Sequence, residues 1–309
     1  MARRIIDALT NTCYFSWQLL ESPGGANIIH RIMDKTDVRL LQGTRDIWCR
    51  DYMPIQIYGN RFIGYEYTPD YLDNPAFAAF QTNPARVLDR LEIDAIQSGL
   101  IIDGGNVITT NKAIIMVDKV FMENSHLKKG MVIDRLEKYF DSEIIFLPWD
   151  KAEKYGHADG IVRDVGNGTV LLTNYYQYDK EYALKYEKIL SKHFEIETLV
   201  FDVQKPCKYN WCYINFLRVG PKIFLPQLTW EDYAGPCQAA CPPEGVKSKS
   251  KPKWYHKHIE EDDLALEQFR RLFPKCEIIQ VSCPQIVEKG GALNCISWNV
   301  RHENKVISD

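Results

Sequence analysis

Residues 101–107 read IIDGGNV, an apolar run that ends in an aspartate and a pair of glycines. A strand-like run beside one polar residue and a turn occurs at four further places along the chain. The polar residues of the five places are Asp51, Asp103, His157, Asn215 and Cys295. Successive members lie 52, 54, 58 and 80 residues apart, and the last interval falls to 56 when the irregular residues 235–258 are set aside. This nearly constant period predicts five repeated units that account for almost the whole chain.

The elements between these residues indicate an α/β fold. Apolar residues at helical spacing predict helices over residues 126–140, 181–194 and 260–273, with weaker patterns at 26–33 and 84–96. Short β-rich runs, such as AIIMV and KIFLP, outnumber these helices by more than two to one. A doubly wound sheet needs close to one helix per strand. We therefore expect repeated units around an axis, each with one strand end at a common centre.

The composition favours a single domain over residues 1–309. The 309 residues are 45% hydrophobic and carry a net charge of -3, without the basic excess of a nucleic-acid-binding protein. The N-terminal residues contain no apolar run that suits a signal sequence or a membrane span, so we expect a cytoplasmic protein. Nine cysteines at irregular spacing favour reduced thiols over disulfides. Residues 235–258, rich in Pro, Lys and Ser, are expected to form a surface insertion.

Brought to one centre, the five units would combine a thiol, an imidazole and several carboxylates. A cysteine beside a histidine is the minimal pair for nucleophilic attack and proton transfer, since the thiolate attacks and the leaving group must then be protonated. The carboxylates of Asp51, Asp103 and Asp159, without metal-like companions, favour a cationic substrate. A planar guanidinium suits two carboxylates because its N–H groups form a fixed fork and leave its carbon open to a nucleophile. The pattern therefore predicts a site for guanidines.

Four motifs, in this order, resemble those of the agmatine deiminase and Porphyromonas-type peptidylarginine deiminase family. They are Trp48-Cys49-Arg50-Asp51 with Pro54, Asp103-Gly104-Gly105-Asn106, Gly156-His157-Ala158-Asp159 and Gly290-Gly291-Ala292-Leu293-Asn294-Cys295. The resemblance extends from roughly residue 40 to residue 300. Any one motif alone would be weak, but four in register are specific.

The resemblance implies a fold and a set of roles. The fold would be the five-bladed α/β propeller, or pentein, of the guanidine-modifying superfamily, with pseudo-fivefold repeats of the ββαβ type. Cys295 would attack the guanidinium carbon and form a covalent thiouronium intermediate. His157 would protonate the departing ammonia and then activate water, while Asp51 and Asp159 hold the guanidinium nitrogens. Family members usually carry a glutamate that orients the histidine where this chain has the shorter Asp103. No metal or organic cofactor is implied.

The function that the sequence favours is hydrolytic deimination of a guanidine, with agmatine as the leading substrate, to a ureido product and ammonia. Trp48 and Asn215 are further candidates for substrate binding, Trp48 by stacking. Deimination of peptidylarginine or free arginine, and transfer of the amidino group to an amine, are alternatives with related chemistry. The expected partner is a small guanidine, with a homodimer left open, and neither nucleic acid nor a membrane is expected.

Two hypotheses outside this chemistry stay open. The fold could be a propeller that binds without catalysis, with Cys295 and His157 as ordinary buried residues. Alternatively, the 235–258 insertion could hold zinc through Cys237, Cys241, His256 and His258, because structural zinc sites favour cysteine pairs roughly two to four residues apart. A plain surface insertion is favoured, because the segment has no strand pattern that would place the two histidines on one face.

Overall fold

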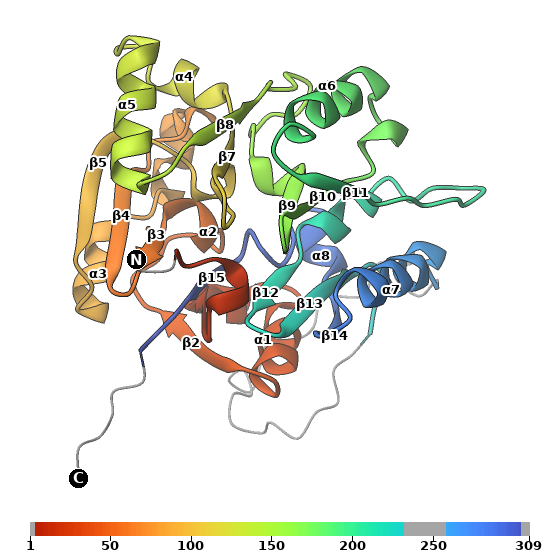
Figure 1. Ribbon diagram of the computed structural model, residues 1–309. Helices are drawn as coiled ribbons and strands as arrows, with labels where there is room; N and C mark the ends of the chain where they lie inside the picture. The colour runs from red at the N-terminus through yellow and green to blue at the C-terminus, as the bar shows by residue number, and fades with distance from the viewer. Residues whose placement is uncertain (1–3, 232–257, 304–309) are drawn as a thin grey trace.

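A computed structural model describes residues 4–231 and 258–303 of the chain (Figure 1). The candidate zinc ligands Cys237, Cys241 and His256 lie outside the described residues, as does nearly all of the 235–258 insertion. The zinc site and the surface insertion therefore both stay predictions. His258 is exposed, and its Nε2 lies 3.0 Å from Asp263 Oδ2. Within the described ranges, no helix combines the length and the apolar character that a membrane crossing requires.

The described strands form five sheets of three strands each. The first two sheets along the chain contain β3 (Ile55–Tyr58), β4 (Arg61–Glu66) and β5 (Ala95–Ile101), and β6 (Ile108–Thr109), β7 (Ile114–Val117) and β8 (Ile144–Leu147). The next two contain β9 (Val162–Gly166), β10 (Thr169–Leu172) and β11 (Glu195–Thr198), and β12 (Leu217–Val219), β13 (Lys222–Gln227) and β14 (Glu277–Ser282). The fifth contains β15 (Ser297–Val300), β1 (Thr12–Ser16) and β2 (Asp37–Leu41).

Each sheet repeats one pattern of strand directions. Its middle strand is antiparallel to one neighbour and parallel to the other. A parallel pair needs a crossover, and a helix supplies it in every sheet. The crossover helices are α3 (Pro84–Leu91), α5 (Lys129–Phe140), α6 (Lys180–Leu190), α7 (Glu260–Leu272) and, in the fifth sheet, α1 (Gly25–Met33). The predicted α/β fold is therefore confirmed, and each unit has the order ββαβ.

The fifth sheet joins the two ends of the described chain. Strand β15 lies near the C-terminal end and pairs antiparallel with β1 near the N-terminal end, with Thr12 opposite Val300. Strand β2 then adds in parallel on the other side of β1. The unit is thus completed by residues that are almost the whole chain apart in sequence.

Tertiary pairing overrides part of the helical pattern predicted for residues 84–96. Helix α3 ends at Leu91, Glu92 adopts a left-handed φ of 54°, and β5 begins at Ala95. The start of β5 pairs in parallel with β4, so the predicted helix is wrong at its C-terminal end. Helices α5, α6 and α7 confirm the three strong predictions. Strands β1, β5 and β9 are not among the predicted runs, because each mixes apolar residues with polar residues or glycine.

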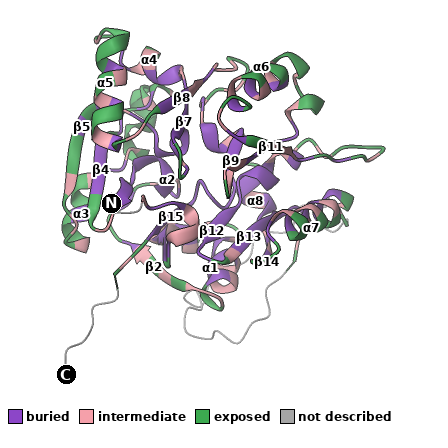
Figure 2. Cartoon of the chain, in the orientation of Figure 1, coloured by how far each residue is buried: buried purple, intermediate pink, exposed green. Residues whose placement is uncertain are grey.

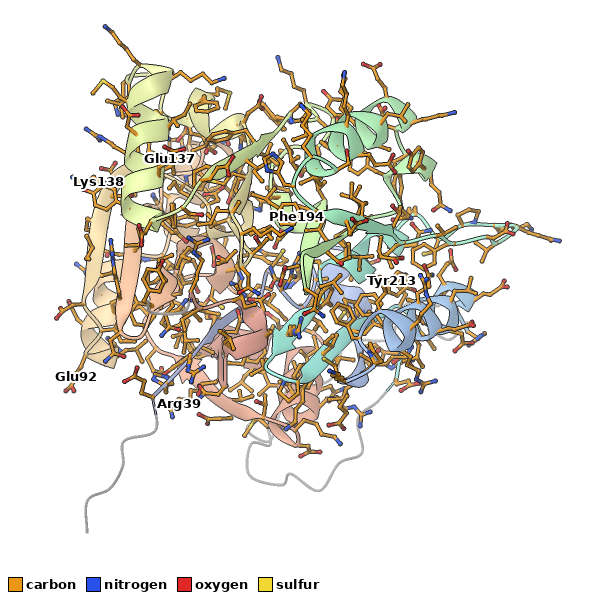
Figure 3. All side chains as sticks on the ribbon, in the orientation of Figure 1. Arg39, Glu92, Glu137, Lys138, Phe194 and Tyr213 are labelled. Atoms are coloured by element: carbon orange, nitrogen blue, oxygen red, sulfur yellow. The ribbon has the colours of Figure 1, made fainter. Side chains whose placement is uncertain are left out.

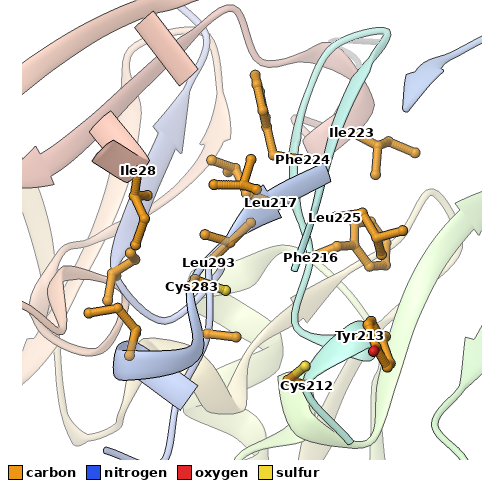
Figure 4. Packing of buried hydrophobic residues seen from close by; sticks show 14 of the residues in the cluster. Ile28, Cys212, Tyr213, Phe216, Leu217, Ile223, Phe224, Leu225, Cys283 and Leu293 are labelled. Atoms are coloured by element: carbon orange, nitrogen blue, oxygen red, sulfur yellow. The ribbon is translucent and has the colours of Figure 1, made fainter. Parts of the chain in front are cut away.

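The helices cover the outside of the sheets, and the strands hold most of the core (Figure 2). Glu137 and Lys138 of α5 project away from the protein (Figure 3), whereas Phe269 of α7 packs edge-on against Phe216, with ring centroids 5.1 Å apart. Figure 4 shows Phe216 close to Leu225 in this core. A fully buried side chain of this size stabilises the fold by about 1.5–3 kcal/mol. This packing fixes the strands that follow the polar turns.

Candidate active site

Each of the five polar residues lies in the turn or short helical segment just before the first strand of a sheet. Four short helical segments lie beside or around these residues, and the last of them precedes Asn215. They are α2 (Cys49–Tyr52), which contains Asp51, η5 (Gly104–Asn106), which follows Asp103, η6 (Ala158–Gly160), which follows His157, and η8 (Asn210–Ile214). Cys295 lies in the turn before β15. The regular spacing in the sequence therefore corresponds to equivalent positions in five similar units.

Hydrogen bonds connect the five turns into a ring. Each turn is bonded to the next one along the chain, and the fifth is bonded back to the first. The bonds are Gly105 N–H to Asp51 Oδ1 at 3.1 Å, His157 Nε2 with Asp103 Oδ2 at 3.0 Å, Asn215 Nδ2 to Asp159 Oδ2 at 2.9 Å, Cys295 N–H to Asn215 Oδ1 at 3.2 Å and Arg50 N–H to Cys295 O at 3.2 Å. The predicted site residues Asp51, Asp103, His157, Asp159, Asn215 and Cys295 thus lie together.

Cys295 is a buried thiol in acidic surroundings. The residue is 8% exposed, and its Sγ lies 3.6 Å from Asp159 Oδ2. Burial raises the pKa of the thiol well above its usual range, and the carboxylates of Asp159 and Asp51 raise it further. Because the thiolate is the reactive form, the resting residue is a weak nucleophile at neutral pH. A cation bound beside these carboxylates would favour the thiolate.

His157 bridges two carboxylates. Its Nε2 lies 3.0 Å from Asp103 Oδ2, and its Nδ1 lies 3.7 Å from Asp51 Oδ1. Burial by itself would lower the pKa of the imidazole, but Asp51 and then Asp103 raise that pKa to about 10. The ring is therefore protonated at neutral pH and can donate a proton. The short contact also shows that Asp103 reaches the imidazole from a position where the resemblance implies the longer glutamate.

Asp159 is held by two side-chain amides. The residue is 2% exposed, and its Oδ2 accepts hydrogen bonds from Asn215 Nδ2 at 2.9 Å and Asn294 Nδ2 at 2.7 Å. Asn215 Oδ1 in turn accepts from the N–H groups of Ala292 and Cys295, so both polar ends of Asn215 are engaged within the site. Asn294 was not a candidate from the sequence, although it directly precedes the cysteine in its motif.

Asp51 is a buried carboxyl whose approach to His157 requires a neighbouring glycine. Burial raises the pKa of Asp51 to about 8, with His157 opposing this rise and the Asp103 and Asp159 carboxylates adding to it. A Cβ on Gly105 would lie 2.7 Å from Asp51 Oδ1 and 2.7 Å from His157 Nδ1. Only glycine at position 105 lets the carboxyl and the imidazole come this close.

Aromatic side chains surround the polar group. Trp48 is half-buried and packs against Gly291, where an added Cβ would lie 2.4 Å from Trp48 Cζ3 and 3.1 Å from Cys295 Cβ. The rings of Tyr155 and Tyr71 have centroids 5.8 Å and 6.4 Å from that of His157. Trp48 was predicted from its motif. The two tyrosines were not, because Tyr71 in a short 3-10 helical segment and Tyr155 in a loop belong to no motif and to no period.

The sequence assigns the chain to a family. The model of the Porphyromonas-type peptidyl-arginine deiminase family matches residues 19–239 and 252–300, so the chain belongs to this family. Deiminases hydrolyse a carbon–nitrogen bond, and the family is therefore one of hydrolases. The resemblance seen in the four motifs is confirmed.

Individual relatives are distant in sequence but alike in fold. A Legionella pneumophila protein with a provisional agmatine deiminase name is 23% identical over 239 residues, which are 70% of this chain and 60% of that protein. The C. jejuni agmatine deiminase is 16% identical, with a TM-score of 0.69 over 98% of this chain and 97% of that one. The Enterococcus faecalis agmatine deiminase is 14% identical, with a TM-score of 0.68 over 97% and 96% of the two chains. At these identities the two structures establish the fold alone.

Proposed function

We propose that the chain hydrolyses a guanidine to a ureido product and ammonia. The observation that carries this proposal is one cluster of side chains, in which Cys295, Asp51 and Asp159 are buried and His157 is partly buried beside them. The carboxylates provide negative charge for a cation, the thiol provides a nucleophile and the protonated imidazole provides an acid. The deiminase family and the agmatine deiminases with the same fold support the same reaction.

The proposal includes a finer description of the fold, a five-bladed α/β propeller formed by one domain over residues 1–309. Five sheets of the same ββαβ order and hydrogen bonds through all five turns support an arrangement of blades around an axis. The pairing of β15 with β1 would close the ring of blades. In this arrangement the site lies where the five blades meet.

Asp51 and Asp159 would hold the guanidinium group. They belong to different units, and both lie close to the reacting residues, Asp51 beside the imidazole and Asp159 beside the thiol. Hydrogen bonds from a cation to a carboxylate contribute about 1.5–3 kcal/mol each. The cation would also lower the pKa of the Asp51 carboxyl and of the Cys295 thiol, so substrate binding itself would help to generate the nucleophile.

The reaction would proceed in two halves. Cys295 Sγ loses its proton and bonds to the guanidinium carbon, and the nearest acceptor for that proton is Asp159 Oδ2. One carbon–nitrogen bond then breaks as His157 gives its proton to the leaving ammonia, which leaves a thiouronium on the cysteine. Water next loses a proton to His157 and attacks the same carbon. The carbon–sulfur bond breaks, the thiolate takes back the proton held by Asp159, and the ureido product leaves after its hydroxyl proton passes to the released ammonia or to solvent.

Agmatine is the leading substrate within this proposal, because agmatine deiminases are among the structures with the same fold. Arginine, free or at a peptide terminus, is the second candidate. Lys154 Nζ lies 5.9 Å and 5.7 Å from the ring centroids of Tyr71 and Tyr155, and among the described residues it forms no ion pair. A cation beside these rings would suit a substrate carboxylate and oppose a substrate ammonium.

A homodimer and a cytoplasmic location stay predictions.

The test is turnover of three guanidines: agmatine, arginine and a peptide that ends in arginine. We expect equal amounts of ammonia and ureido product from at least one of them, and none with Cys295→Ser. Cys207→Ser is the control, since Cys207 is a half-buried thiol outside the site. Guanidine loss without ammonia when an amine is added would instead indicate amidino transfer. Tight guanidine binding without any turnover would indicate a binding module.

A further inference from the structure

Lys119, the first residue of α4 (Lys119–Glu123), is only 1% exposed. A buried ammonium group is costly unless oxygen atoms accept its hydrogen bonds. Lys119 Nζ lies 2.8 Å from Asp70 Oδ1, 3.0 Å from Tyr155 O and 3.3 Å from Glu123 Oε1. Two N–H groups therefore donate hydrogen bonds, to Asp70 and Tyr155, and the Glu123 carboxylate adds an ion pair, so the ammonium is held in one place.

These acceptors belong to separate parts of the chain. Asp70 lies in residues 67–81, here called the cover segment, which contains η3 (Asp70–Leu72) and η4 (Pro75–Phe80). Tyr155 lies in the loop that leads to His157. The lysine stem packs under the same loop, since a Cβ on Gly156, which has a φ of 66°, would lie 2.6 Å from Lys119 Cδ. One side chain thus attaches both the cover segment and the His157 loop to α4.

Aromatic rings lie between the ammonium and the site. Lys119 Nζ is 5.6 Å from the ring centroid of Tyr71, the residue that follows Asp70. Tyr71 meets Tyr155 edge to face, with centroids 5.1 Å apart and an angle of 83°. Both rings lie near His157, and an added Cβ on Gly290 would contact the Tyr155 ring at 3.5 Å. The two tyrosines therefore cover the imidazole and the turn that leads to the cysteine.

We propose that Lys119 is a positioning residue that clamps the cover segment onto the His157 loop and so limits access to Cys295. The proposal rests on the proposed function only for the roles of Cys295 and His157. The clamp keeps the Tyr71 and Tyr155 rings over the site, which excludes bulk water and holds the imidazole in one orientation. Loss of the ion pair with Asp70 would let the cover segment open while the sheets stay intact.

The test measures access to Cys295 with two thiol reagents of different size. The variants are Asp70→Asn and Lys119→Met, and the control is Asp73→Asn, which changes an exposed carboxylate of the same segment. Peptide mass spectrometry follows the reaction of Cys295 with iodoacetamide and with the bulkier N-phenylmaleimide. The ratio of the two rates does not depend on the pKa of the thiol, because both reagents react with the thiolate. We expect both variants to raise the maleimide-to-iodoacetamide ratio by at least about threefold, and the control to leave it unchanged.

Hydrogen exchange separates a clamp from a general loss of stability. Asp70→Asn should raise exchange in residues 67–81 and 149–157 without changing the melting temperature relative to Asp73→Asn. The double variant should open no further than Lys119→Met, because Asp70→Asn and Lys119→Met remove the same ion pair. If Lys119→Met does not fold, Asp70→Asn still decides, since the Asp70 side chain is 45% exposed. A ratio for Asp70→Asn equal to that of Asp73→Asn overturns the proposal. None of these readouts uses a guanidine, so the result is independent of the proposed reaction.

Discussion

The individual residues of the site carry more negative than positive charge. Asp51 and Asp159 are the two carboxylates proposed to bind the guanidinium, and each is nearly inaccessible to solvent. Replacing either with asparagine keeps its size but removes one charged hydrogen bond, so catalytic efficiency should fall by more than about tenfold. The control is Asp89→Asn on the exposed face of α3. The double variant should lose less than the product of the single losses, because a tilted guanidinium already bonds poorly to the second carboxylate. Single variants that match Asp89→Asn would contradict the two-carboxylate clamp.

The pKa of Asp51 predicts that guanidine binding depends on pH. Burial raises this pKa to about 8 in the free protein, so the protonated fraction of the carboxyl near neutral pH must lose its proton to bind a cation. Affinity of the inactive Cys295→Ser variant should therefore rise by up to about tenfold per unit as the pH increases toward 8. Calorimetry in buffers of different ionisation enthalpy measures the released proton. The pH dependence should disappear when Asp51→Asn is added to Cys295→Ser, and its persistence would assign the proton to another group.

Site residues that belong to sequence motifs could be predicted from the sequence. Residues whose contacts are set by tertiary packing could not. Cys295 and His157 were predictable because they occupy the same position in repeated units and belong to recognisable motifs. Tyr71 in η3 and Tyr155 in a loop lie beside His157, and Lys119 contacts both from the short helix α4. Their contacts are set by tertiary structure, which no local period in the sequence records.

At the scale of the elements, the short η5 turn sets the separation between the first and third units. Gly105→Ala would place a Cβ 2.7 Å from Asp51 Oδ1 and His157 Nδ1, so either the turn or these side chains must move. We expect kcat to fall by at least about tenfold, since small displacements of reacting groups are costly. Gly130→Ala in α5 is the matched control, because its Cβ would meet nothing within 4 Å. That change should stabilise the helix by up to about 1 kcal/mol without altering kcat. Equal kcat values for the two variants would show that the turn tolerates the extra atom.

The elements also show where sequence reasoning stops. Helices α5, α6 and α7 could be predicted, since one apolar stripe of each packs on the sheets and the other face meets solvent. Strands β5 and β9 contain glycine and polar residues, and pairing with their neighbours defines them instead. The order of the five units followed from the spacing of Asp51, Asp103, His157, Asn215 and Cys295, because each residue occupies the turn before a first strand.

At the scale of the whole molecule, Asp7 ties the N-terminal region to two sheets. Its Oδ2 lies 2.6 Å from Arg163 Nη2 in β9, and its Oδ1 accepts from Asn299 Nδ2 in β15 at 3.0 Å. Arg163 is 2% exposed, so Asp7→Ala leaves a buried cation unpaired and should lower the free energy of unfolding by about 1–3 kcal/mol. Burial opposes ionisation of Asp7, but Arg163, Arg50 and the Asn299 hydrogen bond together outweigh it and lower the pKa, so this stabilisation is present at neutral pH and is lost as acid protonates the carboxyl. Urea denaturation at several pH values measures the difference. The exposed Asp94→Ala is the control, and an equal effect of the two changes would contradict the link.

The central claim is that Cys295 attacks the carbon of a guanidine and forms a covalent intermediate. Mass spectrometry of acid-quenched protein tests it most directly. The wild-type chain mixed with its guanidine substrate should gain the mass of the substrate minus one ammonia, and peptide mapping should place that gain on Cys295. The adduct should decay as the ureido product forms, and Cys295→Ser should show neither. Ureido product from Cys295→Ser at the wild-type rate, or a transient adduct on any other residue, would contradict this account.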